Sequence, residues 1–224
     1  MVATSLKYSH ILKSKGRKIA VIGYLTPKNF TIFPNTNNLT IKGEVECIRE
    51  EVEKLKRQGV NIFIALGSSG FDMDKKIAAE VEDLDLVVGG HTHTFLYNGN
   101  APDIEKPEGP YPFVVVQPKT KRKVYVVQAY AYTKYIGNLK LTFDAQGEIK
   151  NVTGNPLLLD NSIPEAEDVL KELNRFYNIK KSREYSSTPI GKSWVVLQGS
   201  KNICRREECN FGNLITDAMI KYVS

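Results

Sequence analysis

Short apolar runs alternate with helix-like segments in the first part of the chain. Residues 18–26, 61–66 and 84–88 are rich in β-branched side chains and almost continuously apolar, as in strands covered on both faces. Between them lie residues 43–58, with apolar positions at helical spacing, and the shorter segment 74–83. The order strand, helix, strand, helix, strand predicts an α/β fold whose sheet contains parallel strands.

The pattern changes downstream of this α/β segment. Residues 113–117, 123–132 and 135–144 are typical of strands, and only short breaks separate them. Such short breaks favour antiparallel pairing. The sequence DAQG at 144–147 predicts a hairpin turn into a further strand at 148–153.

The last sixty residues are organised differently from the rest. Residues 164–177 have the spacing of a surface helix, and the polar stretch 180–189 is typical of a linker. A strand is then predicted at 191–197 and a helix at 213–223. Because the sequence stops inside that helix, we expect a second domain to begin here and to be cut off.

Charge and hydropathy exclude several classes of protein. The 31 basic and 25 acidic residues give a net charge of +6, but the lysines and arginines are scattered and usually have acids nearby. This distribution favours a solvated surface over a nucleic-acid interface. No run of 18 apolar residues is present, so we expect no transmembrane helix. The N-terminus lacks the apolar stretch of a signal peptide.

Three cysteines and three sequons bear on the cellular compartment. Cys204 and Cys209 stand five positions apart in C-R-R-E-E-C, which allows a disulfide, although a reduced pair in an intracellular loop is the alternative. A zinc half-site is less favoured because no second Cys/His pair lies at ligand spacing. The candidate glycosylation sites Asn29, Asn38 and Asn151 favour a secretory route, weakly because sequons are common by chance.

The sequence G-G-H-T-H at 89–93 is the sharpest chemical feature. It follows the buried strand predicted at 84–88, and ligands of α/β sheets bind at the carboxyl ends of strands. Neutral imidazoles are common metal ligands, so His91 and His93 are candidates to hold one ion or two neighbouring ions. The alternative is that both are ordinary polar turn residues. Two of the chain's three histidines in one glycine-rich strand exit favour a metal site.

The earlier strand exit, G-S-S-G at 67–70, has no comparable signature. Its spacing does not match the G-x-S-x-G nucleophile elbow, so Ser69 is not predicted to be a nucleophile. It also lacks the G-K-[ST] of a phosphate-binding loop. On spacing alone it is a polar loop between a strand and a helix.

Several segments together resemble one protein family. They are residues 64–99, V-V-Q-A-Y-A at 126–131, N-P-L-L-L-D at 155–160 and C-R-R-E-E-C-N-F-G-N-L-I-T-D-A-M at 204–219. They resemble the 5′-nucleotidase/apyrase family of metallophosphoesterases, most closely its extracellular animal members, including salivary apyrases of blood-feeding arthropods. The resemblance covers essentially the whole chain.

The resemblance implies a fold and a domain division. Family members have a four-layered α/β/β/α metal domain followed by a C-terminal substrate domain. Residues 1–178 would be the second half of the metal domain, residues 179–190 a linker, and residues 191–224 the truncated beginning of the substrate domain.

The resemblance also implies roles for individual residues. Two divalent ions, zinc or other, would be bound in the full-length protein, with His91 a ligand of one and His93 near the other. Arg205 matches an arginine that contacts the nucleotide, and Cys204 and Cys209 match a family disulfide, which implies an extracellular protein. Ser68 stands where the family motif L-G-H-S-G-F has a metal-binding histidine, so one ion should bind less tightly.

The family's upstream motifs, Asp-x-His, Gly-Asp and Gly-Asn-His-Glu, are not found in this sequence, and we assign no catalytic residue to it. A full-length member would release phosphate from extracellular AMP, ADP or ATP by two-metal hydrolysis. We do not expect this chain alone to hydrolyse nucleotides. The chain is a partial copy of an active enzyme, a degenerate member acting as a secreted binding protein with, for instance, an antihaemostatic role, or a genuine truncated product. The last is disfavoured because an open sheet would expose apolar surface along residues 18–26.

Overall fold

A computed structural model describes residues 7–27, 42–176 and 187–223, with the side chains of residues 176, 201, 202 and 223 left out. The chain divides into two compact units, Met1–Ile163 and Pro164–Ser224, which are described separately. Asn29, Asn38 and most of the expected linker lie outside the described residues.

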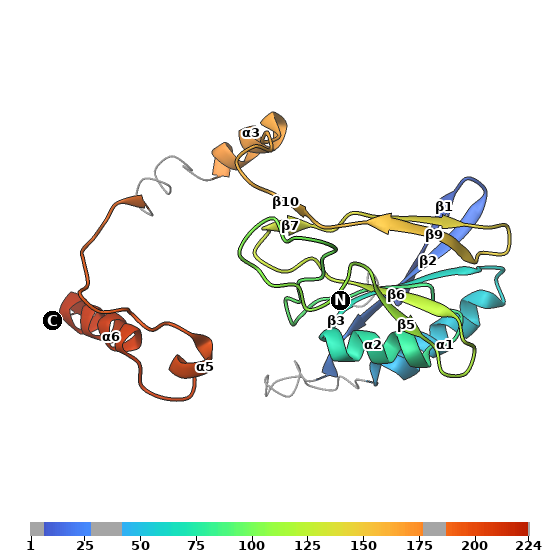
Figure 1. Ribbon diagram of the computed structural model, residues 1–224, viewed down its shortest axis with the longest axis horizontal. Helices are drawn as coiled ribbons and strands as arrows, with labels where there is room; N and C mark the ends of the chain where they lie inside the picture. The colour runs from blue at the N-terminus through green and yellow to red at the C-terminus, as the bar shows by residue number, and fades with distance from the viewer. Residues whose placement is uncertain (1–6, 28–41, 177–186, 224) are drawn as a thin grey trace, which may run out of the picture. The chain divides into compact units, whose positions relative to one another are not determined.

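A six-stranded sheet forms the centre of the first unit (Figure 1). The four inner strands run parallel to one another, and an antiparallel strand closes each edge. In spatial order the strands are β1 (Ser9–Ser14), β2 (Arg17–Leu25), β3 (Ile62–Ser68), β4 (Leu86–Val88), β6 (Lys123–Val127) and β5 (Phe113–Val116). The predicted α/β fold with parallel strands is therefore confirmed.

Two helices cover one face of this sheet (Figure 1). Helix α1 (Glu44–Lys56) buries Ile48, Val52 and Leu55, which lie on one stripe at helical spacing. Helix α2 (Phe71–Glu80) begins three residues earlier than expected, directly after Gly70, whose φ of 95° suits glycine. Because both helices bury their apolar stripes on the sheet, the loops that precede them are fixed at its carboxyl edge.

The opposite face is partly covered by a hairpin. Strand β8 (Leu139–Phe143) pairs antiparallel with β9 (Ile149–Gly154), as the turn sequence predicted, and its leucines pack against the core. The short strands β7 (Tyr135–Ile136) and β10 (Leu157–Leu158) form a second antiparallel pair. Asn151 is exposed on β9.

Two expectations about strands in this unit are wrong. The strand expected at 123–132 ends at Val127, because Tyr130 and Tyr132 adopt left-handed backbone conformations that no strand accommodates. The single strand expected at 135–144 is interrupted after Ile136, and its two parts, β7 and β8, pair in different sheets. Residues 18–26 do not form an open edge, since β1 pairs with β2 along its length from Ser14↔Arg17 to Ser9↔Ile22. The polar sequence of β1 is typical of an edge strand and carried no clear strand signal.

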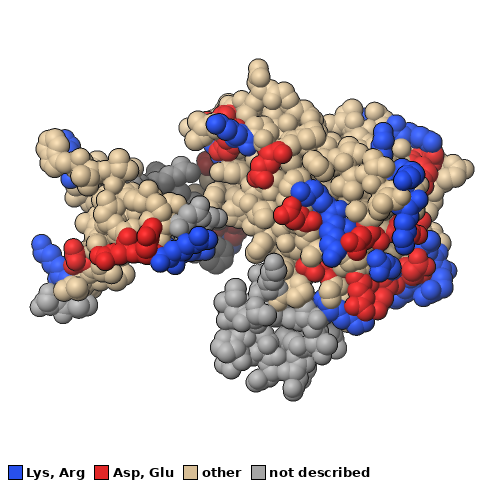
Figure 2. Space-filling model, turned by 60° about the horizontal axis from the view of Figure 1, so that its bottom comes forward, with Lys and Arg blue, Asp and Glu red and all other residues tan. Residues whose placement is uncertain are grey.

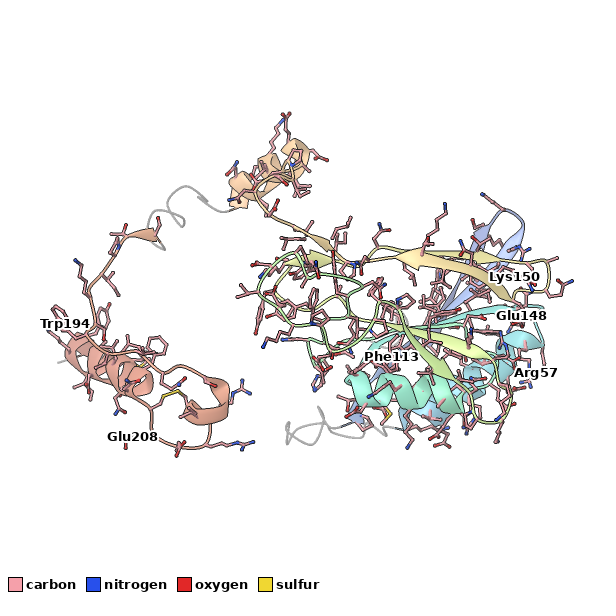
Figure 3. The ribbon with its side chains drawn as sticks, in the orientation of Figure 1. Arg57, Phe113, Glu148, Lys150, Trp194 and Glu208 are labelled. Carbon is pink, nitrogen blue, oxygen red and sulfur yellow. A yellow bond between two sulfur atoms is a disulfide. The ribbon has the colours of Figure 1, made fainter. Side chains whose placement is uncertain are left out.

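The second unit contains helices and extended chain. Its helices are α3 (Glu167–Phe176), α5 (Lys201–Cys204) and α6 (Asn210–Val223). The strand expected at 191–197 does not form: in the described part of the chain it has no neighbouring strand to bond with, and Trp194 and Val196 are fully or largely exposed. Figure 3 shows Trp194 on this extended segment. None of the described helices is long and apolar enough to cross a membrane.

Charged residues of both signs are interspersed on the face shown in Figure 2. Many form ion pairs, such as Lys54 with Glu51 and Lys56 with Asp83. The expectation that the chain binds no nucleic acid stays a prediction.

A buried carboxylate, Asp85, ties β3, β4 and β6 together at their amino ends. Its Oδ2 accepts a hydrogen bond from the Phe63 backbone N–H at 2.8 Å, and its Oδ1 lies 3.0 Å from Arg122, which also pairs with Glu148. Burial raises the pKa of Asp85 to about 7, although the N–H and the guanidinium oppose that rise.

This raised pKa predicts a pH-dependent stability. The folded chain holds a proton on Asp85 that the unfolded chain has already lost, so stability should fall as the pH rises from about 4 to about 7. In Asp85→Asn this contribution is absent. Urea unfolding should therefore be measured at several pH values for the parent and for Asp85→Asn. The difference between their free energies of unfolding should change across this pH window; a constant difference would contradict the raised pKa of Asp85.

Candidate functional site

The loops after β3, β4 and β6 meet at the carboxyl edge of the sheet, because these three strands are parallel neighbours. Backbone hydrogen bonds join the loops: the Gly70 N–H donates to the Gly90 carbonyl at 3.0 Å, and the Gly89 N–H donates to that of Val127 at 2.9 Å. Both histidines of the G-G-H-T-H sequence lie in this cluster, where ligand sites of α/β sheets form.

His91 and His93 are both exposed, so neither is a buried core residue. Their φ angles are 80° and 58°, in the left-handed region that residues other than glycine seldom adopt. Backbone strain of this kind concentrates at functional sites. The two imidazoles have different surroundings: His91 borders a depression, whereas His93 packs edge-on against Tyr132 with 5.3 Å between the ring centroids.

The depression beside His91 has a volume of about 510 Å³. Glu44, Asp72 and Ser69 contribute polar groups to its lining, and Met73 contributes an apolar one. The Ser69 hydroxyl is buried and has no hydrogen-bond partner among the described residues. An unpartnered buried hydroxyl is uncommon in folded proteins, and here it lies at the margin of a cavity.

Ser68 is the last residue of β3 and is half-buried. A Cβ placed on Gly90 would stand 3.9 Å from its hydroxyl oxygen, so Ser68 lies next to the residue that precedes His91. The position that the resemblance marks as a lost ligand is therefore adjacent to the histidine loop.

Beneath the loop lies a buried polar network that the sequence analysis missed. The Tyr24 hydroxyl donates to Asp74 Oδ1 at 2.7 Å, and Gln128 Nε2 donates to Asp74 Oδ2 at 2.6 Å. Burial raises the pKa of Asp74 and also that of Tyr24. One signal was available in the sequence: Asp74 stands three and four positions before Ile77 and Ala78, on the apolar stripe of its helix.

The described residues do not by themselves fit a two-ion centre. No group of three His, Cys, Asp or Glu side chains that could hold a metal occurs among them. The only other histidine of the sequence, His10, lies on β1. His91 and His93 could therefore supply part of a donor set, and any remaining ligands would have to come from elsewhere.

In the second unit, Arg205 is exposed on a short loop closed by the Cys204–Cys209 disulfide, whose Cα atoms lie 5.3 Å apart. Figure 3 shows the sulfur–sulfur bond beside α5, with Glu208 on the same loop. The predicted disulfide is thus present in the structure, and the reduced pair is not. The neighbouring Arg206 gives the loop a second exposed positive charge.

Comparison with known proteins identifies the family. No family model matches the chain. The human 5′-nucleotidase is 48% identical over 203 residues, which cover 90% of this chain and 35% of that protein. The chain belongs to the 5′-nucleotidase family. Protein 5NUC of Lutzomyia longipalpis is 42% identical over 97% of the chain, and a snake venom 5′-nucleotidase of Crotalus adamanteus is 44% identical over 94%.

Solved structures agree with this assignment. The 5′-nucleotidase precursor of Thermus thermophilus superposes with a TM-score of 0.79 at 32% identity, covering 96% of this chain and 42% of that one. The NAD nucleotidase of Haemophilus influenzae, at 21% identity and a TM-score of 0.59, shares the fold. This 5′-nucleotidase family member spans about a third of the length of its curated relatives.

Close packing at Gly89 gives a test of the site's geometry. A Cβ added there would lie 1.8 Å from Asp74 Oδ2, so Gly89→Ala must displace either the loop or the buried carboxylate. We expect a loss of about 2 kcal/mol or more in the free energy of unfolding. Gly23→Ala is the control, since a Cβ there meets only the Tyr8 carbonyl at 3.9 Å. Chemical denaturation of both variants checks this, and equal stabilities would refute the packing described.

Proposed function

We propose that this chain is part of a phosphohydrolase that releases phosphate from extracellular nucleotides. One observation carries the proposal: 48% identity to a 5′-nucleotidase extends over 90% of the chain, including the strand exits that bring His91 and His93 to the sheet edge. The substrate would be AMP, ADP or ATP. The rest of the activity would depend on the portion of the family's length that this chain does not span.

Within this proposal, His91 and His93 are ligands for a divalent ion, zinc or another. Three observations support this role: both imidazoles are exposed, both lie at the carboxyl edge of the sheet, and a depression borders His91. The family resemblance assigns two ions to the centre. The described residues supply only part of a donor set, so further ligands for those ions would come from outside the described residues.

Arg205, in the second unit, is proposed to be a nucleotide-binding residue. Its guanidinium is exposed and therefore free of the desolvation that a buried charge would carry. Arginine suits phosphate because its planar group offers paired N–H donors. Residues 179–190 are proposed as the linker that joins residues 1–178 of the metal domain to residues 191–224 of the substrate domain.

We also propose that the protein is secreted. Disulfides persist in oxidising compartments, and Cys204 and Cys209 form one here. One relative is named a snake venom protein. Asn151, exposed on β9, is a candidate glycosylation site, as are Asn29 and Asn38.

Ser68 favours a second candidate function. A neutral hydroxyl is a poorer ligand for zinc than imidazole, so a member with serine here would hold one ion weakly. Such a protein could retain the scaffold and act as a secreted binding protein. Phosphate release from AMP, ADP or ATP separates the two functions, measured on the full-length natural protein with zinc or manganese. Release of phosphate supports the enzyme. A protein that releases no phosphate but binds a host surface protein supports the alternative.

Ion binding by the chain itself gives a sharper prediction. Isothermal titration with zinc should give an affinity that falls about tenfold or more in His91→Ala, because one of two imidazole ligands is lost. His10→Ala is the matched control, an exposed histidine on β1 outside the site. Ser68→His should tighten binding by adding an imidazole next to the loop. If His91→Ala bound zinc as the parent does, His91 would not be a ligand.

A further inference from the structure

The loop that carries His91 and His93 is fixed through the residues that alternate with them. Gln128 Nε2 donates to the Gly90 carbonyl at 3.2 Å, and Gln128 Oε1 accepts from the Thr94 N–H at 3.1 Å. The Thr92 hydroxyl is 3.5 Å from the same Oε1 and 2.8 Å from the Thr94 hydroxyl. Gln128 therefore contacts the chain before, between and after the two histidines.

Gln128 is itself held by Asp74. The amide hydrogens of Gln128 reach Asp74 Oδ2 and the Gly90 carbonyl, which leaves Oε1 facing the loop as an acceptor. A reversed amide would place N–H groups against the Thr94 N–H and would present an oxygen to the carboxylate. The buried carboxylate thus fixes the orientation of the amide, and the amide fixes the loop.

We propose that Asp74 and Gln128 are positioning residues, which hold the Gly89–Thr94 loop in the strained conformation that presents His91 and His93. The left-handed φ angles of both histidines are costly and persist only where surrounding contacts determine them. Asp74 is fully buried and Gln128 is 3% exposed, so water does not compete effectively for these hydrogen bonds. The positioning role of Asp74 and Gln128 is inferred from these hydrogen bonds. Its effect on ion binding rests on the proposed function.

A second buried glutamine supplies a matched control. Gln117, 1% exposed, donates through its amide to the Ala78 and Val81 carbonyls and accepts from the Thr120 hydroxyl, and none of these partners lies in the histidine loop. Replacing either glutamine by leucine removes a buried amide of the same size from the same unit. Only Gln128→Leu should release the loop.

Amide hydrogen exchange followed by NMR tests the proposal on the whole chain. In Gln128→Leu, exchange at the Thr94 and Gly70 N–H groups should accelerate about tenfold or more. Thr94 N–H loses its acceptor, and the Gly90 carbonyl, which accepts from Gly70 N–H, loses its hydrogen bond from Gln128. The nitrogen signals of the His91 and His93 imidazoles should shift. In Gln117→Leu, exchange at these sites should change no more than at core amides of β3. Equal effects of the two variants on the loop would overturn the proposal.

Variants at Asp74 separate the effect of its hydrogen bonds from the effect of its packing. They also test the proposal if Gln128→Leu does not fold. Asp74→Asn keeps an oxygen for Gln128, and its NH₂ can donate to the Tyr24 hydroxyl, so the loop should stay protected. Asp74→Leu keeps the branched four-atom side-chain skeleton, with methyl groups larger than the carboxylate oxygens, and has no acceptor, so it should release the loop as Gln128→Leu does. A protected loop in Asp74→Leu would mean that this side chain only fills space, and the proposal would fail.

Zinc titration of the same variants tells this proposal apart from the proposed function. If the parent chain binds zinc, Gln128→Leu should weaken binding about as much as His91→Ala, whereas Gln117→Leu should not; unchanged zinc affinity in a released loop would overturn the presenting role. If the parent binds no zinc, the prediction that His91 and His93 hold an ion in this chain alone fails, and the exchange data alone decide whether Asp74 and Gln128 hold the loop.

Discussion

Parallel pairing of β3, β4 and β6 is the constraint on which the rest of the first unit depends. It places the carboxyl ends of three strands side by side. The loops that follow these strands carry the polar residues, whereas the strands themselves are apolar. Asp74 and Gln128 join these ends from below through short, buried hydrogen bonds. Under the proposal above, the exposed histidines are supported by these buried hydrogen bonds, as a preformed ligand site requires.

The sequence was sufficient to predict the elements that depend on one strong local pattern. The β-branched runs at β2, β3 and β4 and the amphipathic spacing of α1 each bury a continuous apolar face, so composition and period agree. The G-G-H-T-H sequence predicts the place of the candidate site, because it directly follows a strand whose own pattern is clear. The spacing of Cys204 and Cys209 alone does not decide between a disulfide and a reduced pair, and the assignment of the disulfide from sequence depends on the family resemblance.

The features that the sequence did not predict depend on distant partners. Strand β1 is polar and exists because β2 offers it an edge, whereas residues 191–197 have apolar strand character but no neighbouring strand among the described residues. Gln128 gains its role only when its strand end meets Gly90 and Asp74, 38 and 54 residues away in sequence. Left-handed conformations at Tyr130 and Tyr132 likewise have no local signal.

We propose that His91 and His93 bind a divalent ion at the carboxyl edge of the sheet. Addition of Mn²⁺ to the isotopically labelled chain tests it most directly, because a bound paramagnetic ion broadens the NMR signals of nearby nuclei. We expect substoichiometric Mn²⁺ to broaden selectively the imidazole signals of His91 and His93 and to leave those of His10 sharp. Broadening that is equal at all three histidines, or that spares the loop, would contradict it.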